Sequence, residues 1–158
     1  MIGEKLTTLF CIVVGGVFLV SGFGKILDVT SFAFLIDSYG LGWAVSLAPI
    51  IVIVEIATGL LLIFGIQLRR VSVITILILS GFTIAYGYGY WAHGVENCGC
   101  FGAMSRIKTP FWIVLLRNAF LVYFMVETYR RTIIEPVVIK WKPTVILFTI
   151  IVVAFGNR

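Results

Sequence analysis

The stretch LTTLFCIVVGGVFLVSGFGKIL, residues 6–27, decides the fold. It is apolar over almost its whole length and carries a single charge, Lys25, close to its end. A helix of about 20 such residues is long enough to cross the ~30 Å hydrocarbon core of a bilayer. We therefore predict a transmembrane helix. A cleaved signal peptide is disfavoured, because the run is too long and no small-residue cleavage motif follows it.

Further apolar runs follow over residues 47–67, 71–91, 111–127 and 143–155. The first three have the length of a membrane span, whereas 143–155 is short enough to lie at the interface instead. We favour a span for it, because the basic and aromatic residues KWK at 140–142 stand at its start, where interfacial anchors are common.

The composition supports this interpretation. Of the 158 residues, 61% are hydrophobic and 12% are charged, whereas soluble domains are about half apolar and about a quarter charged. We predict one all-α transmembrane domain over residues 1–158, a four-helix bundle in the lipid bilayer with the fifth span at its C-terminal end. The net charge of +5 does not indicate nucleic acid, because the basic residues stand at the ends of the apolar runs.

Two further sequence patterns predict features at the ends of the spans. Phe32, Leu35, Ile36 and Tyr39 recur at helical spacing between the first two spans, which predicts a short amphipathic helix that lies on the outer surface or packs over the mouth of the bundle. The run YGYGYW at 86–91 is typical of an aromatic belt at the membrane interface. Its alternative interpretation is a stacking wall for a quinone ring.

The orientation follows from the basic residues. With a cytoplasmic N-terminus, the inner segments hold seven Lys and Arg residues and the outer segments hold four, in line with the positive-inside rule. The loop at residues 92–110 then faces the periplasm of a bacterial inner membrane, where disulfides persist. The inner set is Lys5, Arg69, Arg70, Arg130, Arg131, Lys140 and Lys142, and the outer set is Lys25, Arg106, Lys108 and Arg158.

Two ionisable residues stand inside the spans. By helical rise, Glu55 and Arg117 both lie about 10 Å below the outer boundary. Intramembrane charges are costly and usually pair within the bundle, so we expect these two to meet, with Asn118 beside them. A purely structural pair and a functional pair are equally compatible with the pattern. Lys25 is near enough to the boundary for its ammonium group to reach water.

The loop sequence GVENCGCFGAM, residues 94–104, holds the candidate chemistry. A bridge between Cys98 and Cys100 would close a very short ring, which Gly99 permits. Short rings stabilise a fold little, and strained accessible bridges exchange readily. We therefore favour a redox pair over a structural clip. Cys11 lies too deep in the first span to reach either cysteine.

A metal site is the weaker alternative. His93, Cys98 and Cys100 supply three ligands, with Glu96 as a fourth, and there is no second cluster of Cys and His. A closed zinc site requires four well-placed ligands, so we expect no metal.

The cysteine block and its surroundings resemble a known family. The segments FLVSGFGKILDVTSFAFLIDSYGL (18–41), CGCFG (98–102) and PFWIVLLRNAFLV (110–122) are similar to the MauE branch of the DoxX-like membrane proteins. The resemblance implies a four-helix bundle whose outer cysteines, Cys98 and Cys100, handle electrons. It also implies matched positions at Arg117 and Asn118 without a known role.

The resemblance further implies a partner and an acceptor. MauE proteins act in methylamine dehydrogenase maturation with a thioredoxin-like protein on periplasmic disulfides, and DoxX relatives are linked to thiosulfate:quinone oxidation. We therefore predict a thiol–disulfide oxidoreductase that exchanges electrons with a periplasmic thioredoxin-like protein, with a membrane quinone as the candidate cofactor. The alternative is a non-catalytic scaffold subunit of a membrane complex, in which the disulfide only shapes the loop.

Overall fold

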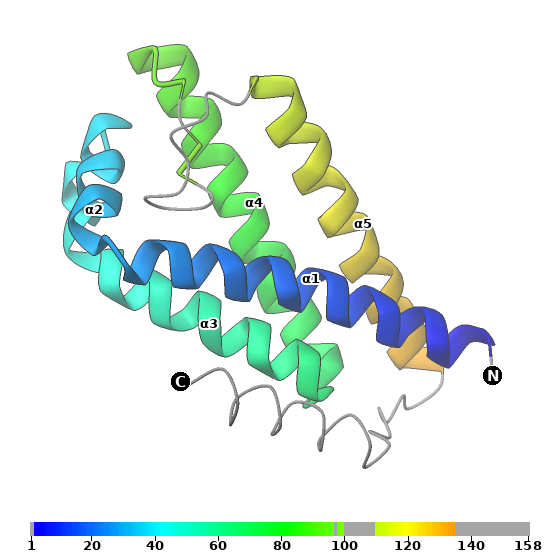
Figure 1. Ribbon diagram of the computed structural model, residues 1–158. Helices are drawn as coiled ribbons and strands as arrows, with labels where there is room; N and C mark the ends of the chain where they lie inside the picture. Colours follow the sequence, from blue (N-terminus) through cyan, green and yellow to red (C-terminus); the bar gives the residue numbers. More distant parts are fainter. Residues whose placement is uncertain (1, 97, 100–109, 135–158) are drawn as a thin grey trace, which may run out of the picture.

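The described part of the chain is helical and contains no strand. The structure is a computed structural model that describes residues 2–96, 98–99 and 110–134. Its elements are α1 (Ile2–Ile26), α2 (Val29–Ser38), the 3-10 helix η1 (Gly42–Leu47), α3 (Ala48–Phe64), α4 (Leu68–His93) and α5 (Phe111–Ile134), as Figure 1 shows.

Four of the described segments are long and apolar enough to cross a membrane: α1, η1 with α3, α4, and α5. The predicted all-α membrane bundle is therefore confirmed. The spans predicted at 6–27, 47–67, 71–91 and 111–127 fall on these segments, and α5 continues past the predicted end to Ile134. The predicted segment 143–155 lies outside the described residues.

The long helices are arranged as two neighbouring antiparallel pairs, α1 with α3 and α4 with α5 (Figure 1). Small residues allow the close approach of the first pair. A Cβ atom built on Gly15 would lie 2.7 Å from Ile63 Cγ1 and 2.9 Å from the Gly59 carbonyl oxygen. Any larger residue at position 15 would therefore push the two helices apart.

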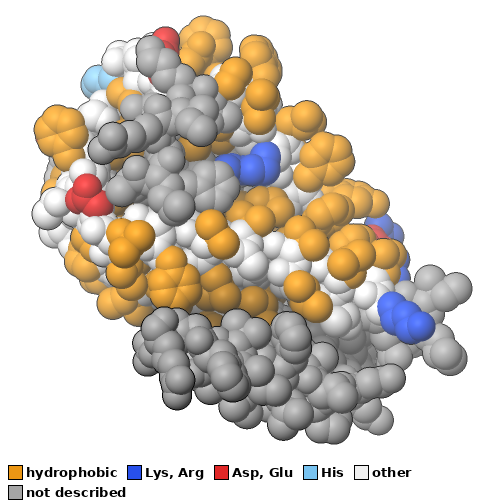
Figure 2. Space-filling model, viewed as in Figure 1, with side chains coloured by type: hydrophobic (Ala, Val, Ile, Leu, Met, Phe, Trp, Pro, Cys, Tyr) orange, Lys and Arg blue, Asp and Glu red, His pale blue; other side chains and the backbone are white. Residues whose placement is uncertain are grey.

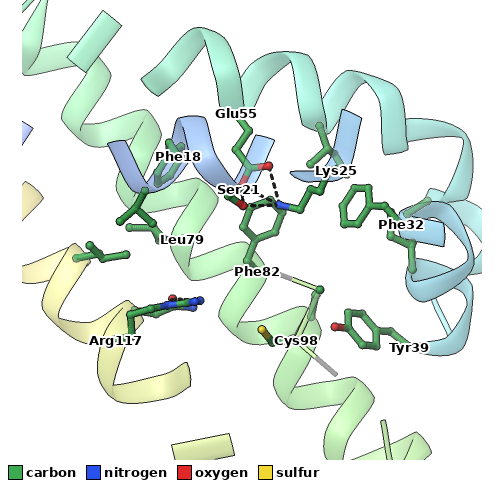
Figure 3. A pocket seen from close by; sticks show the side chains of 18 of the residues that line it. Phe18, Ser21, Lys25, Phe32, Tyr39, Glu55, Leu79, Phe82, Cys98 and Arg117 are labelled. Atoms are coloured by element: carbon green, nitrogen blue, oxygen red, sulfur yellow. Dashed lines mark hydrogen bonds and ion pairs between the residues drawn. The ribbon is translucent and has the colours of Figure 1, made fainter. Parts of the chain in front are cut away.

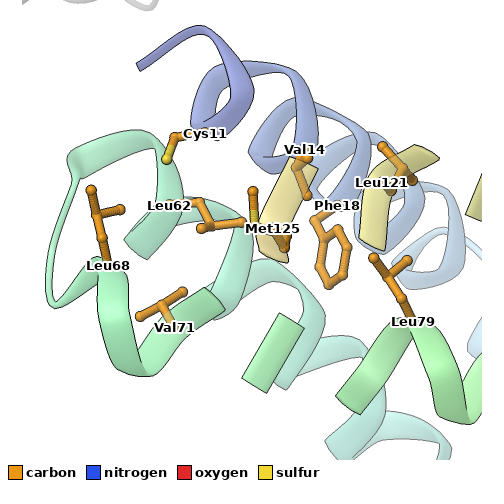
Figure 4. Packing of buried hydrophobic residues seen from close by; sticks show 9 residues of the cluster. All are labelled: Cys11, Val14, Phe18, Leu62, Leu68, Val71, Leu79, Leu121 and Met125. Atoms are coloured by element: carbon orange, nitrogen blue, oxygen red, sulfur yellow. The ribbon is translucent and has the colours of Figure 1, made fainter. Parts of the chain in front are cut away.

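Hydrophobic packing joins the two pairs. One cluster of buried side chains takes members from all four long helices: Cys11, Val14, Phe18, Leu62, Leu68, Val71, Leu79, Leu121 and Met125 (Figure 4). Cys11 is 0% exposed, as expected for a small buried side chain. It belongs to a different cluster from Cys98, which packs near Tyr39, Tyr86 and Val114.

The outward faces of the helices are also apolar. Figure 2 shows hydrophobic side chains spread over the visible face, with few charges among them. Phe23, Ile53, Leu77 and Leu116, one from each long helix, are all more than half exposed. Such a surface would aggregate in water, and it matches the lipid bilayer that the composition predicts.

The amphipathic segment forms α2, which packs against the bundle with η1. Phe32 and Ile36 are buried in a second cluster with Ala44, Ala48 and Val52. Tyr39, directly after α2, is 5% exposed. Of the two predicted placements, the structure therefore shows the one over the bundle (Figure 1). We call the end formed by α2, η1, residues 94–96 and residues 98–99 the loop end.

Candidate functional site: a cavity at the loop end

A cavity of about 120 Å³ lies inside the bundle at the loop end (Figure 3). Its lining comes from α1, α2, η1, α3, α4 and α5, together with Cys98 and Gly99. Most of the lining is apolar. The polar and charged groups are Ser21, Lys25, Tyr39, Glu55, Cys98, Arg117 and Asn118.

One wall carries a buried ion pair between α1 and α3. Lys25 Nζ lies 2.6 Å from Glu55 Oε2 and 2.8 Å from Glu55 Oε1, and it donates to Ser21 Oγ at 3.0 Å. Ser21 Oγ in turn donates to Glu55 Oε1 at 2.7 Å. Lys25 is 2% exposed and Glu55 is 3% exposed. Two charges at this depth are tolerable only because they neutralise each other and share hydrogen bonds.

The expected pairing of Glu55 with Arg117 is wrong, because Glu55 forms its ion pair with Lys25. Equal depth is shared by many residues of a bundle, whereas contact depends on which helices are neighbours. In the structure α3 packs closely against α1, so Glu55 meets Lys25. The expectation that Lys25 reaches water is also wrong. Its ammonium group is covered by the rings of Phe32 and Phe82, with centroids at 5.0 Å and 4.7 Å.

Arg117 lines the same cavity from α5. Its Nε and Nη2 donate to Asn118 Oδ1 at 3.2 Å and 3.0 Å. Asn118 Nδ2 donates to Thr83 Oγ1 at 2.9 Å, and Thr83 Oγ1 donates to the Leu79 carbonyl at 2.7 Å. This chain of bonds ties α5 to α4. It also fixes the orientation of the Asn118 amide, because its oxygen faces a donor and its nitrogen faces an acceptor.

Cys98 is half-buried and lines the cavity. Figure 3 shows its sulfur pointing into the cavity on the side from which the Arg117 guanidinium approaches. The next residue, Gly99, has a φ of +59°, and the Leu35 side chain fills the position that a Cβ would occupy. Cys100 lies outside the described residues, so its bridge with Cys98 stays a prediction.

His93 packs as a surface ring at the end of α4. It lies edge-on to Tyr88 with ring centroids 5.5 Å apart, and it covers Gly40, where a Cβ would clash with it. Within residues 2–96, 98–99 and 110–134, no three His, Cys, Asp or Glu side chains gather closely enough to hold a metal ion.

The aromatic run at 86–91 does not supply the cavity wall. Tyr86 is buried against Phe111, and Trp91 is 76% exposed. The aromatic lining comes instead from Phe18, Phe32, Tyr39 and Phe82.

The sequence did not indicate Ser21, Phe82 and Thr83 as residues of the site, and it placed Lys25 near water. The sequence does contain a pattern that links Ser21 to Lys25, because residues four positions apart lie on the same face of a helix.

Fold and site together define a multi-pass membrane protein with a mostly apolar cavity at one end, which is also lined by charged residues and a cysteine. The family model described as methylamine utilisation protein MauE matches residues 3–127, and the chain therefore belongs to the MauE family. It is thus a membrane protein related to methylamine utilisation. Comparison with curated proteins and with solved structures gave no match. The family match concerns MauE alone, so the wider DoxX-like relationship stays a prediction.

Proposed function

We propose that this protein is a membrane thiol–disulfide oxidoreductase that exchanges electrons with a thioredoxin-like partner in the periplasm through Cys98 and Cys100. The observation that supports this most is the position of Cys98. Its thiol is half-buried at an interior cavity that also holds the charge of Arg117. Exchange requires a thiolate, which a nearby cation favours, and it requires access for a second sulfur.

The exchange proceeds through a mixed disulfide. A thiolate of the partner attacks one sulfur of the Cys98–Cys100 bridge, which forms the mixed disulfide and releases the other cysteine as a thiolate. The second thiolate of the partner then attacks its own sulfur in the mixed disulfide. The partner leaves oxidised, and Cys98 and Cys100 have gained two electrons. The reverse sequence would deliver reducing equivalents to the partner.

The test captures this intermediate. The Cys100→Ser variant traps the reverse direction, in which the Cys98 thiolate attacks a disulfide of the partner. Because Cys100 is then absent and cannot resolve the mixed disulfide, the adduct should accumulate in membranes of the native organism after acid quenching. It should disappear with reductant, and mass spectrometry should identify a partner with a Cys-x-x-Cys motif. A Cys11→Ser variant with Cys100→Ser is the matched control and should retain the adduct, because Cys11 is fully buried elsewhere.

Two outcomes would contradict the proposal. One is an adduct that persists when Cys98 is also replaced by serine. The other is the absence of any adduct from both the Cys98→Ser and the Cys100→Ser variants, with a native bridge that stays oxidised under mild reductant. That second result would favour a scaffold with a structural disulfide.

A further inference from the structure

We infer that a contact between α2 and the cysteine segment, in which Leu35 fills the space beside Gly99, controls access to Cys98. We call this contact the latch. With the latch closed, α2 covers Cys98, and the latch opens before a partner protein forms a disulfide with it. Leu35 acts on Cys98 through Gly99, so it is a positioning residue. The inference rests on the proposed exchange function and adds the step that regulates it.

The Cys98 sulfur faces a space too small for a partner protein. It points into the cavity, whose volume is about 120 Å³ (Figure 3). An apolar cavity of ~150 Å³ holds a single benzene ring, so this cavity has no room for a loop of another protein. A mixed disulfide requires two sulfur atoms about 2.05 Å apart. An element at the loop end therefore has to move when Cys98 exchanges with a protein.

The latch depends on the absence of a side chain at residue 99. Gly99 has a φ of +59°, and Leu35 Cδ2 occupies the position that a Cβ would take. Leu35 Cγ lies 3.5 Å from that position, and the Tyr39 hydroxyl oxygen lies 3.9 Å from it. Leu35 and Cys98 also pack against the same buried cluster. The last turn of α2 is thereby held directly against the cysteine segment.

The residues before Cys98 are bound to α4. The Val95 N–H donates to the Gly89 carbonyl oxygen at 3.1 Å, and the Tyr86 hydroxyl group donates to the Glu96 carbonyl oxygen at 3.3 Å. Because α4 is one of the four long apolar helices, its place in the bundle is set by the helices beside it. This part of the segment therefore stays with α4 when the latch opens.

The short helix α2 is the element suited to move. It has ten residues, and helices of this length are marginal without tertiary contacts. Gly40, which follows it closely, has a φ of +77°, and residues at the end of an element commonly absorb the backbone change when that element moves. Loss of the Leu35 contact should therefore release the end of α2 from Cys98.

Alkylation of Cys98 tests the latch without a partner protein. The full-length protein in lipid nanodiscs carries Cys11→Ser and Cys100→Ser, which leaves Cys98 as its one thiol. Its rates with N-ethylmaleimide and with a maleimide on a long polyethylene glycol chain are each divided by the rate of glutathione. The bulky reagent reports access for a protein. The ratio of the two rates isolates access, because a change in the thiolate fraction affects both reagents equally.

Removal of the Leu35 side chain should open the latch. In Leu35→Ala, the rate with the bulky reagent should rise about tenfold or more, because loss of the packing raises the fraction of open protein. The rate with N-ethylmaleimide should rise less. Leu35→Met keeps the side-chain volume and should keep the native rates. Phe34→Ala is the matched control, since Phe34 is the preceding residue and is 74% exposed, and it should leave both rates unchanged.

A second variant changes the latch from the side of the cysteine segment. The methyl group of Gly99→Ala cannot coexist with Leu35 in its native position, so this variant should also open the latch. The double variant should react no faster than the faster single variant, because both changes break one contact. Thermal melting confirms that the variants are folded, and Gly99→Ala carries the test if Leu35→Ala does not fold. A native rate with the bulky reagent in either folded single variant, or rates that multiply in the double variant, would overturn the latch.

The two proposals fail separately. A protein that forms mixed disulfides, and whose alkylation does not respond to Leu35→Ala, retains the exchange function and loses the latch. A protein whose alkylation follows the latch, and which forms no mixed disulfide, retains the control of access to Cys98 and loses the exchange function.

Discussion

At the residue scale, the Lys25 ammonium group is held in the interior by Ser21 and Glu55 and covered by two phenylalanine rings. Removing two charges from water costs several kcal/mol per ion, and their attraction rarely repays more than that. The pair therefore adds little net stability. Its effect is to fix how α1 faces α3, because either charge alone would be stranded in a nonpolar interior.

Single and double neutral variants test this interpretation. Lys25→Met or Glu55→Gln alone should lower the free energy of unfolding by about 3–5 kcal/mol, because each leaves one buried charge without its partner. The double variant should be more stable than either single variant. Equilibrium unfolding in detergent measures all three, and single variants as stable as the native protein would contradict the structure.

A second ion pair provides the control. Glu127 and Arg131 on α5 lie 2.8 Å apart with partly exposed side chains. Pairs of this kind contribute at most about 1 kcal/mol. Glu127→Gln should therefore have a much smaller effect than Glu55→Gln.

The sequence placed Glu55 and Arg117 inside the spans, but it did not identify Lys25 as a buried ion and did not show which charges pair. Hydropathy places Glu55 and Arg117 inside spans, and both do line the interior cavity. The partner of Glu55 depends on helix order around the bundle, a long-range property that no local pattern contains. Lys25 was misjudged because the chain folds back over it as α2, where Phe32 covers it.

At the scale of elements, α2 depends on its N-cap. The Asp28 carboxylate accepts from the Ser31 backbone N–H at 2.9 Å and from the Ser31 and Thr30 hydroxyl groups. These bonds hold the pKa of the Asp28 carboxyl below its ordinary value of 3.8, with the Ser31 side chain as the largest cause. The capped helix places Phe32, Ile36 and Tyr39 on the cavity.

The cap predicts a pH dependence of α2. Because the pKa is lowered on folding, the carboxylate stabilises α2 fully above pH 3.8 and loses this effect as the pH falls below that value. Amide hydrogen exchange of α2 should therefore accelerate in acid relative to Asp28→Asn, which keeps a capping oxygen without a titrating group. Asp28→Ala should exchange faster than both at neutral pH. If acid accelerates the amide hydrogen exchange of α2 equally in the native protein and in Asp28→Asn, the account is contradicted.

Periodicity in the sequence predicted α2 well. The spacing of Phe32, Leu35, Ile36 and Tyr39 indicates one apolar face, and a helix does run over Val29–Ser38. The same pattern suits a helix on a lipid surface and a helix on other helices, since both bury an apolar face. Only the tertiary contacts with η1 and α3 distinguish the two placements.

At the scale of the whole molecule, the bundle was predictable because every span in a bilayer must satisfy its own backbone hydrogen bonds, so long apolar runs become helices. The cavity was not predictable. It arises where side chains from elements far apart in the sequence, including Ser21, Phe82 and Arg117, fail to fill the space between the two helix pairs.

The orientation of the bundle has a direct test. We predict a cytoplasmic N-terminus and a periplasmic loop end, from the asymmetry of Lys and Arg. A membrane-impermeant maleimide applied to reduced, intact spheroplasts should label Cys98 or Cys100. Cys11, which is 0% exposed, should stay unlabelled as the internal control. Labelling that occurs only after permeabilisation would show that the loop end faces the cytoplasm and would contradict the predicted orientation.

The central claim is that Cys98 and Cys100 are a working redox pair, and their reduction potential tests it most directly. Equilibrating the purified protein with glutathione or dithiothreitol buffers and trapping the thiols by alkylation gives this potential. We predict a value above about −300 mV, in the range of exchanging pairs. Arg117→Gln should shift it downward, because a nearby cation stabilises the reduced thiolate form. A value below about −300 mV that does not respond to Arg117→Gln is expected of a structural bridge and would contradict the account.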